Sequence, residues 1–540
     1  MSSHRTDLSS SKEGKEMRAW KMIGFGAAVS VLLALAAQSA AGQATRPTTV
    51  KAQHGGTLIA ARAADAVLWD PAHINENDSL WAANQTNANL IMATADGKGF
   101  QPYIAKSWTI SKNGRVFTFH IFPNARFCDG SAITAQDVAF SFARASKKDA
   151  IVSWQYPQGM QVKATGAKTV VITLPSANAS FLSYLTLWGT AIVSKSYALK
   201  VGDKGLASKP LGSGPFCLKS WQKGSEIDLV RNRYFWLTDK QGNKLPYLDG
   251  IQWKIIKDDT ARVLALRSGQ VDVITPVPPT QVAQLMTVKS LSVGESPLLG
   301  TESLFLNFNV PALADEKVRQ ALNYATDKQG IIKAVLFGHG RPALSPLFLA
   351  NYTTEKYGYP YDLAKAKQLM AGSKFPHGFS AAVTYTGGDS IAQQTLTILK
   401  SEWAQIGVNI SLKPIEEGVY FSTWQSGKWD MMWVKATNDI YDPAENLHFE
   451  MMGKEGGSDS GWSGFEDKHL NGLVLAAEKE MNKAKRSALY NQIQRIYMAE
   501  GPQVYLFHPS NLWAEKKRVH GFQVYKTGLM PFMYTWMSSS

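Results

Sequence analysis

The chain has 540 residues, of which 45% are hydrophobic and 19% are charged, and its formal net charge is +14. This composition is that of a globular protein with room for about two to four domains, and no low-complexity tract interrupts it. Lys and Arg are scattered rather than interleaved with aromatic residues along a basic stripe, so nucleic acid is not an expected partner.

The first 42 residues have the pattern of an export signal. A hydrophilic stretch ends in Arg18 and Lys21, an apolar run follows at 22–37, and small residues occupy 39–42. This order is typical of a cleaved signal peptide, and the run is shorter than the roughly 20 residues of a membrane span. An uncleaved anchor is the alternative. Because no Cys lies near the cleavage region, we expect a periplasmic protein without a lipid anchor.

Strand and helix patterns alternate along the first half of the chain. Residues 116–121 alternate apolar and polar side chains, as a strand does, and residues 251–256 repeat the pattern. Thr134 and Asp137 have the spacing of a capping box at the start of a helix over 135–144.

The two cysteines, Cys128 and Cys217, lie within this part of the chain. An oxidising compartment would allow them to pair, but the sequence does not give the distance between their backbones, so both possibilities stay open. No Cys-x-x-Cys motif is present, and metal or redox chemistry is therefore not expected from them.

Helical stripes dominate the second half of the chain. Apolar residues recur at helical spacing over 315–325, 391–406 and 487–500. Gly407 follows the second of these as a C-cap candidate, and a strand is expected at 408–412. Mixed patterning of this kind predicts an α/β protein in which helices pack on sheets.

Motifs for chemistry are missing from the sequence. It has no Gly-x-Ser-x-Gly nucleophile elbow, no His-Glu-x-x-His zinc helix and no Gly-x-x-x-x-Gly-Lys-Ser/Thr loop for ATP. We therefore expect no catalytic residues, no metal site and no cofactor. An exported hydrolase is the least favoured class.

Several short sequence segments, in a fixed order along the chain, are the most informative feature of the sequence. They are Ala-Lys-Ser-Trp at 105–108, Asn-Gly-Arg-Val-Phe-Thr-Phe-His-Ile at 113–121, Asn-Ala-Arg-Phe-Cys-Asp-Gly-Ser-Ala-Ile-Thr-Ala-Gln-Asp-Val-Ala-Phe-Ser-Phe at 124–142, Leu-Gly-Ser-Gly-Pro-Phe at 211–216, Val-Arg-Gln-Ala-Leu-Asn-Tyr-Ala-Thr-Asp at 318–327 and Asp-Ile-Tyr-Asp-Pro at 439–443. Together they resemble the family 5 solute-binding proteins of bacterial ABC importers, over roughly residues 54–530. That family captures a ligand and performs no chemistry on it.

The resemblance implies a fold and its domain boundaries. The expected fold is the two-lobed, type II-like Venus-flytrap of periplasmic binding proteins, with an extra domain inserted in the first lobe. The first lobe would take 54–75, 205–277 and 506–540, the inserted domain 76–204, and the second lobe 278–505. The chain would cross between the lobes near 273–279 and 504–510.

The same resemblance predicts a ligand contact in the segment 430–443. Peptide receptors of the family hold the ligand's α-ammonium with an Asp four residues before the final Pro, which here is Asp439. A carboxylate in a closed, partly dry cleft forms a charge-assisted bond to a cation. A turn-forming Asp is the alternative, and it is the favoured interpretation of Asp442.

Two departures from the peptide-receptor pattern adjoin Asp439. Ala436 stands where a Trp usually packs on the ligand, and Lys435 stands where Gly is common; Thr437 and Asn438 complete this set of candidates. Lys435 argues for a different or partly anionic ligand, unless it points to solvent. The stretch 384–390 has no Arg or Lys to grip a ligand carboxylate, which puts a dipeptide clamp in doubt.

Six further contact candidates follow from the resemblance. Asn75 and Glu76 match a loop of the first lobe that faces the ligand. The others start a second-lobe strand or match a loop at the far end of the cleft. They are Thr301, Glu302, Trp462 and Ser463.

The sequence thus predicts a periplasmic receptor of an ABC importer that captures a peptide or peptide-like solute by lobe closure. A monomer would deliver the ligand to a separate permease and ATPase complex. The same fold binding an opine, a sugar or a metal chelate, or serving as a sensor, remains the alternative.

Overall fold

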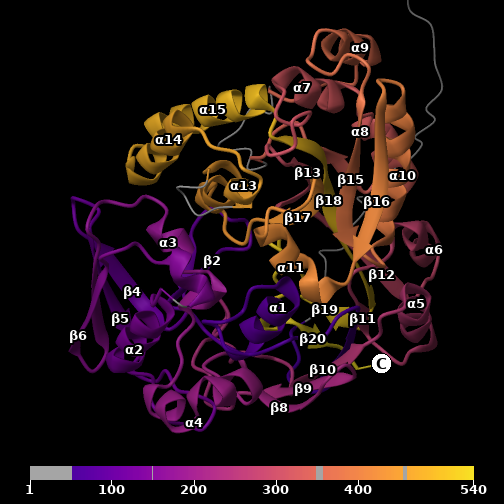
Figure 1. Cartoon of the computed structure of the whole chain (residues 1–540). Helices are drawn as coiled ribbons and strands as arrows, with labels where there is room; N and C mark the ends of the chain where they lie inside the picture. Colours follow the sequence, from indigo (N-terminus) through magenta and orange to yellow (C-terminus); the bar gives the residue numbers. More distant parts are fainter. Residues whose placement is uncertain (1–50, 149, 348–356, 454–458, 540) are drawn as a thin grey trace, which may run out of the picture. The chain divides into compact units, whose positions relative to one another are not determined.

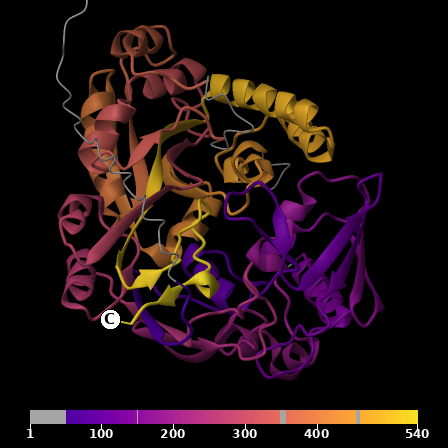
Figure 2. The same cartoon turned by 180° about the vertical axis from the view of Figure 1, so that it is seen from behind.

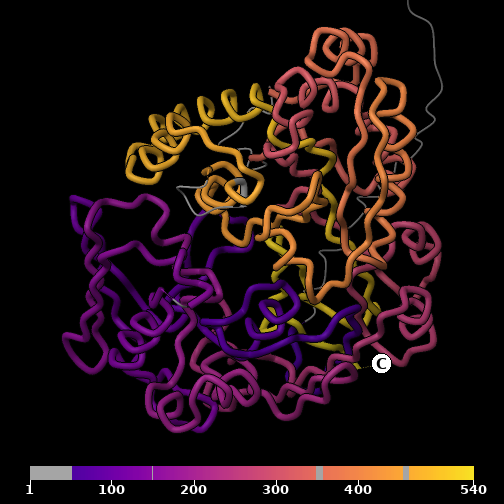
Figure 3. The backbone as a smooth tube through the Cα atoms, in the orientation of Figure 1, coloured from indigo at the N-terminus to yellow at the C-terminus, as the bar shows by residue number. Residues whose placement is uncertain are grey.

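The computed structural model describes residues 51–148, 150–347, 357–453 and 459–539. The predicted signal peptide lies outside the described residues. The chain divides into 1–51 and 52–540, and everything below concerns the second unit. Figure 1 shows its elements, and Figure 3 traces the backbone in the same orientation.

A 12-stranded mixed sheet is the main framework. Ten strands follow one path and two more, β12 (Leu291–Pro297) and β14 (Gly340–Pro342), pair with β18 beside it. The path is β16 (Val408–Ile415), β15 (Phe379–Thr386), β17 (Met431–Thr437), β13 (Gly300–Leu306), β18 (Gln503–Lys516), β11 (Val273–Ile274), β1 (Thr57–Arg62), β10 (Gly250–Ile255), β9 (Glu226–Arg231) and β8 (Phe216–Gln222).

Strand β18 belongs to both halves of this sheet. Its residues 503–507 pair with β13, whereas its residues 510–516 pair with β12 and, in part, with β11. The chain also passes from one half to the other between the end of β12 and the start of β13. Two adjacent connections therefore join the halves, and Figure 2 shows β18, in yellow, from behind.

The half of the sheet that holds β1 has two apolar cores. One gathers Trp69, Trp253 and Phe532, and the C-terminal segment supplies part of it. The other packs α5 (Asp259–Ser268) and α6 (Val282–Met286) beneath the sheet.

The other half holds three parallel strands, β15, β16 and β17. Their core includes Val383, Leu396 and Trp403, contributed by β15 and by α10 (Ser390–Ala404). Because the strands are parallel, their carboxyl ends meet at one edge of the sheet. Helices α10 and α11 (Glu417–Gln425) begin at that edge, directly after β15 and β16.

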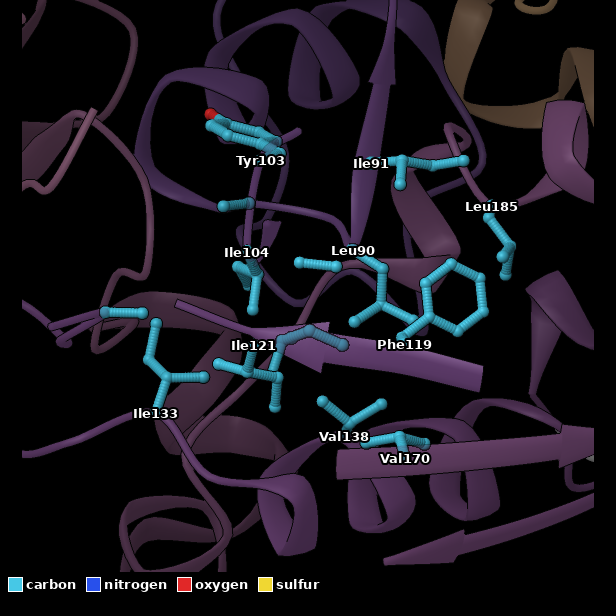
Figure 4. Packing of buried hydrophobic residues seen from close by; sticks show 14 of the residues in the cluster. Leu90, Ile91, Tyr103, Ile104, Phe119, Ile121, Ile133, Val138, Val170 and Leu185 are labelled. Atoms are coloured by element: carbon cyan, nitrogen blue, oxygen red, sulfur yellow. The ribbon is translucent and has the colours of Figure 1, made fainter. Parts of the chain in front are cut away.

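A separate four-stranded sheet, in the order β4-β5-β7-β6, packs on α2 (Ala135–Ala145). The predicted strand is β5 (Val116–Ile121), whose Phe119 and Ile121 are buried in the core drawn in Figure 4. The predicted capping box is confirmed, because the Thr134 side chain accepts from the Asp137 N–H while Asp137 accepts from the Thr134 N–H.

The described part of the chain holds further α-helices and strands. They are α1 (Asn77–Thr86), β2 (Ile91–Ala93), β3 (Phe100–Pro102), β4 (Ala105–Ile110), β6 (Gln161–Gly166), β7 (Thr169–Thr173), α3 (Phe181–Tyr184), α4 (Lys195–Ser208), α7 (Glu316–Tyr324), α8 (Lys328–Val335), α9 (Leu363–Ala371), α12 (Ala444–Asn446), α13 (Asp459–Trp462), α14 (Lys468–Lys479), α15 (Lys483–Glu500), β19 (Val519–His520) and β20 (Trp536–Met537).

The three predicted helices of the second half are present as α7, α10 and α15. The prediction of Gly407 as C-cap is wrong by two residues: Gln405 caps α10 and keeps right-handed helical angles. Gly407 instead adopts φ 80°, which turns the chain into β16. In α15, Ile493 is buried, whereas Leu489 is only partly buried.

The question of the two cysteines is answered by the structure. Cys128 and Cys217 form a disulfide with their Cα atoms 5.9 Å apart. It links the loop between β5 and α2 to strand β8. Among the described residues, no helix has both the length and the apolarity needed to cross a membrane.

Candidate ligand-binding site

Asp439 lines a hollow of about 650 Å³ that opens to solvent. Its walls come from α1, from residues around β2, from the loop after β17 and from the C-terminal segment. The lining residues are Asn84, Gln85, Asn89, Ile91, Met92, Ala93, Tyr103, Thr186, Pro215, Asp439, Tyr441, Tyr525, Thr527, Leu529, Pro531 and Met533. A hollow with mainly apolar walls and a few polar groups is typical of small-ligand sites.

The Asp439 carboxyl is the acidic group of this hollow. Its Oδ1 is buried, and no described residue donates a hydrogen bond to it. Burial raises the pKa of Asp439 to about 7, because a carboxylate away from water loses its hydration. A cation that entered the hollow would supply the missing partner and restore the charged form.

Glu445 fixes the backbone that presents Asp439. Its Oε2 accepts hydrogen bonds from the Asp439 N–H at 2.6 Å and from the Ile440 N–H at 3.3 Å. Burial and then the neighbouring Asp439 charge raise the pKa of Glu445 well above its usual range. Two carboxyl groups therefore lie close together with no described cation between them, which makes this loop a place where a ligand cation is favoured.

Asn438 and Thr437 shape the same loop without lining the hollow. The Asn438 N–H donates to the Leu299 carbonyl at 2.6 Å, and its Nδ2 donates to the Asp442 carbonyl at 3.1 Å. The Thr437 Oγ1 accepts from Asn77 Nδ2 of α1 at 3.4 Å. Both residues hold the loop in place, and direct contact with a ligand stays a prediction for them.

Lys435 makes an ion pair at the edge of the sheet. Its Nζ lies 2.7 Å from Asp389 Oδ2, and half of its side chain is exposed. Burial lowers the pKa of Lys435, but the carboxylates of Glu302 and Asp389 raise it by more. Lys435 is therefore charged and already paired, and it does not line the hollow of Asp439.

The first two residues of β13 after its initial Gly face different surroundings. Thr301 pairs in register with Ala436 and contacts His508, with 3.0 Å between Thr301 Oγ1 and His508 Nδ1. Glu302 stands opposite Lys435 and is buried. Burial raises the pKa of Glu302 to about 7, while Lys435 lowers it and Asp389 raises it.

The other four predicted contacts lie outside the hollow. Asn75 is exposed, and Glu76 caps α1 by accepting from the Ser79 N–H at 2.8 Å. Trp462 packs edge to face on Trp424 with the ring centroids 5.2 Å apart. Ser463 is buried, and its carbonyl accepts from the Phe308 N–H at 2.7 Å. Local packing or capping accounts for Glu76, Trp462 and Ser463, and ligand contact stays a prediction for all four residues.

Sequence reasoning missed most of the wall around Asp439. Tyr441 follows Asp439 by two residues, but Tyr525 and Met533 come from the C-terminal segment and Tyr103 from before β4. No local pattern marks these residues, because only the folded chain brings the segments together. Among the described residues, no group of three or more His, Cys, Asp or Glu is arranged to hold a metal ion.

Residues 99–457 match the family model described as "Bacterial extracellular solute-binding proteins, family 5 Middle". The chain belongs to this family. The resemblance stated from the sequence phrases is thereby confirmed.

Two curated relatives cover most of the chain. The probable D,D-dipeptide-binding periplasmic protein DdpA of Escherichia coli K12 is 28% identical over 477 residues, which are 86% of this chain and 91% of that protein. The dipeptide-binding protein of the same organism is 30% identical over 455 residues, which are 78% of this chain and 83% of that protein. Both relatives are named as binding proteins rather than enzymes.

A solved structure supports the fold. The periplasmic binding protein DppA of Helicobacter pylori, in complex with the peptide STSA, superposes with a TM-score of 0.81 at 26% identity. The match covers 90% of this chain and 99% of that one. The expected α/β, two-lobed fold of periplasmic binding proteins is confirmed.

Proposed function

We propose that this protein is the periplasmic substrate-binding subunit of an ABC importer and that it captures a peptide or peptide-like solute through its α-ammonium group. The observation that carries the proposal is the Asp439 carboxyl, which lines the hollow while its buried Oδ1 has no described hydrogen-bond donor. An ammonium group is the complement of such a carboxylate. The relatives named above are peptide binders, which supports the same ligand class.

Capture would proceed by closure of two lobes. The hollow takes its walls from residues of both proposed lobes. A ligand inside it would therefore make more contacts when the lobes are together. Contacts made only in the closed form shift the population toward that form. The closed complex would then deliver its ligand to a permease and ATPase complex, with the binding protein as a monomer that catalyses nothing itself.

The lobe boundaries form part of the proposal, with one change from the expectation. Val282 and Leu291 pack in one core with Val263 and Leu512, and β12 pairs with the late part of β18. We therefore assign residues 278–297 to the first lobe and start the second lobe near residue 298. The inserted domain at 76–204, and a cleaved signal over 1–42 without a lipid anchor, are proposed as before.

Calorimetry with the mature protein tests the ligand class. We expect Ala-Ala-Ala to bind and its N-acetylated form to bind at least about tenfold more weakly, because acetylation removes the cation that Asp439 would hold. Solution scattering should show a decrease in the radius of gyration with the free peptide. Equal affinity for the two peptides would contradict the amine site. Native mass spectrometry of protein purified from its host would reveal a non-peptide solute, the alternative.

A further inference from the structure

The carboxyl edge of the second-lobe sheet gathers charged side chains close to the Asp439 loop. Strands β15, β16 and β17 are parallel and end at this edge, at Thr386, Ile415 and Thr437. In open α/β sheets, ligands bind outside the carboxyl ends of the strands. Asp389 at the start of α10, Glu417 at the start of α11 and Lys435 on β17 all lie here.

Lys435 is occupied by this group rather than offered to a ligand anion. Its Nζ lies 2.7 Å from Asp389 Oδ2, and Asp389 uses its other oxygen to accept from the Ala392 N–H at 3.1 Å. The carboxylates of Glu302 and Glu417 also act on Lys435 electrostatically. Three carboxylates thus act on one ammonium group, and the net charge of these four ionised side chains is negative.

Glu302 is the buried carboxyl of this group that has neither a hydrogen bond nor an ion pair to another described residue. Its residue is 6% exposed, its Oε2 is buried, and no described residue donates a hydrogen bond to its carboxyl. It stands directly across the β13–β17 ladder from Lys435 but makes no ion pair within 4 Å with any described residue. Leaving a buried carboxylate unpaired is unfavourable. A ligand cation would relieve this cost.

The geometry points to Glu302 as the binding group for a second cation on the ligand, the side-chain ammonium or guanidinium of a basic residue whose α-ammonium is held by Asp439. This inference rests on the proposed function. Lys435 and Thr437 share one face of β17, and the strand path from residue 435 to residue 439 spans at most about 14 Å. An extended peptide of three or four residues covers about 10–14 Å. A basic residue at the second or third position could therefore reach Glu302.

The excess of negative charge also decides against the partly anionic ligand considered from Lys435 alone. An anion placed beside Lys435 would be repelled by Glu302, Asp389 and Glu417, whose charges act on Lys435, and it would have to displace Asp389 from its ion pair. A cation beside Glu302 meets one ammonium group and three carboxylates. The preferred substrate class is therefore a cationic peptide.

A peptide panel tests the inference on the mature wild-type protein by calorimetry at pH 8. The probes are Ala-Lys-Ala and Ala-Ala-Lys, with norleucine or Glu in place of Lys. We expect at least one Lys peptide to bind about 10- to 100-fold more tightly than its norleucine counterpart, and the Glu peptides to bind most weakly. In Glu302→Gln this preference should fall below about threefold while the norleucine affinities hold. Glu450→Gln, a buried carboxyl that is not part of this charged group, should keep the full preference.

The outcomes distinguish a failure of the Glu302 inference from a failure of the proposed function. If norleucine peptides bind but Lys peptides bind no better to wild type, or if the preference survives in a folded Glu302→Gln protein, the inference is overturned and the proposed function stands. If none of the peptides binds, both are overturned. The ratio of the Lys-peptide affinity to the norleucine-peptide affinity is measured on the wild-type protein, so this part of the test does not depend on the folding of a variant. Should Glu302→Gln fail to fold, Glu302→Asp, which keeps the charge but withdraws it by one methylene, should reduce the preference in its place.

Discussion

Ser180 Oγ donates a 2.8 Å hydrogen bond to Asp442 Oδ1, and this bond joins residues that are 262 positions apart in the chain. Both residues are buried. Asp442 also accepts from the Ala444 N–H at 3.1 Å, as the predicted turn residue would, and its Oδ2 lies 3.5 Å from Arg486 Nη2. The contact therefore ties the proposed inserted domain to the loop that presents Asp439.

Apolar contacts surround this bond. Tyr184 and Leu187 pack with Ile440 and Ala444 in one small core. Trp154 meets Phe449 edge to face, with the ring centroids 4.4 Å apart. On the proposed lobe boundaries, the two sides of this core belong to different lobes, so we expect the contact only in the closed form, which it would stabilise.

Asp442→Asn should weaken ligand binding although Asp442 does not line the hollow. Removing a charged acceptor from a buried network costs about 1.5–3 kcal/mol, and a smaller closed population weakens the apparent affinity in proportion. We expect the Kd of a bound tripeptide to rise roughly tenfold by calorimetry. Ser180→Ala should act in the same direction with a smaller effect. An unchanged Kd in both variants would show that the contact does not contribute to closure.

Asp439→Asn should separate stability from binding. In the ligand-free protein the substitution removes a buried charge whose pKa is raised to about 7 by burial, so the melting temperature at pH 8 should increase. The affinity for an amine-bearing tripeptide should fall roughly 10- to 100-fold because the charge-assisted bond is lost.

Glu450→Gln is the matched control for this prediction. Glu450 is also buried with a pKa raised to about 7 by burial, but it does not line the hollow. Glu450→Gln should raise the melting temperature without changing the affinity for the tripeptide. A loss of stability in Asp439→Asn would mean that the ligand-free protein satisfies this carboxylate in another way.

The stability of the ligand-free protein should decrease as the pH rises from about 5 to 7. Burial raises the pKa values of Asp439, Glu302, Glu402 and Glu450 to about 7, whereas in the unfolded chain Asp and Glu titrate near 4. In this window the folded state holds more protons than the unfolded state, so the free energy of unfolding falls as the pH rises.

Two other groups have the opposite effect on the pH dependence of stability. Burial lowers the pKa of His508 to about 3, so His508 favours the folded state as the pH rises toward about 6.5. This one group acts against the four carboxyls named above and against Glu515, whose pKa burial raises to about 8. Burial lowers the pKa of Lys328 to about 7, so it acts in the same sense as His508 only above pH 7. Thermal scans at pH 5, 6 and 7 check the sign. Glu402→Gln should flatten the dependence, and a melting temperature that rises with pH across this range would contradict it.

How much the sequence could predict depends on how local each feature is. The capping box of Thr134 and Asp137 and the alternation of β5 depend on neighbours within a few residues, and both are confirmed. The isolation of Glu302 could not be predicted, because it follows from the register that places β13 against β17 and from the ion pair that Lys435 makes with Asp389. The C-terminal wall of the hollow could not be predicted either, because only the folded chain brings residues 525–533 to the hollow.

The disulfide should make a large contribution to stability. It closes a loop with a sequence separation of 89 residues, and a loop of that length corresponds to about 4.6 kcal/mol from the restricted unfolded chain. Cys128→Ser combined with Cys217→Ser should lower the free energy of unfolding by about that amount in urea titrations. The reduced wild-type protein should lose a similar amount, while reduction should not affect the double variant. Two reactive thiols in the native, unreduced protein would show that the pair does not form.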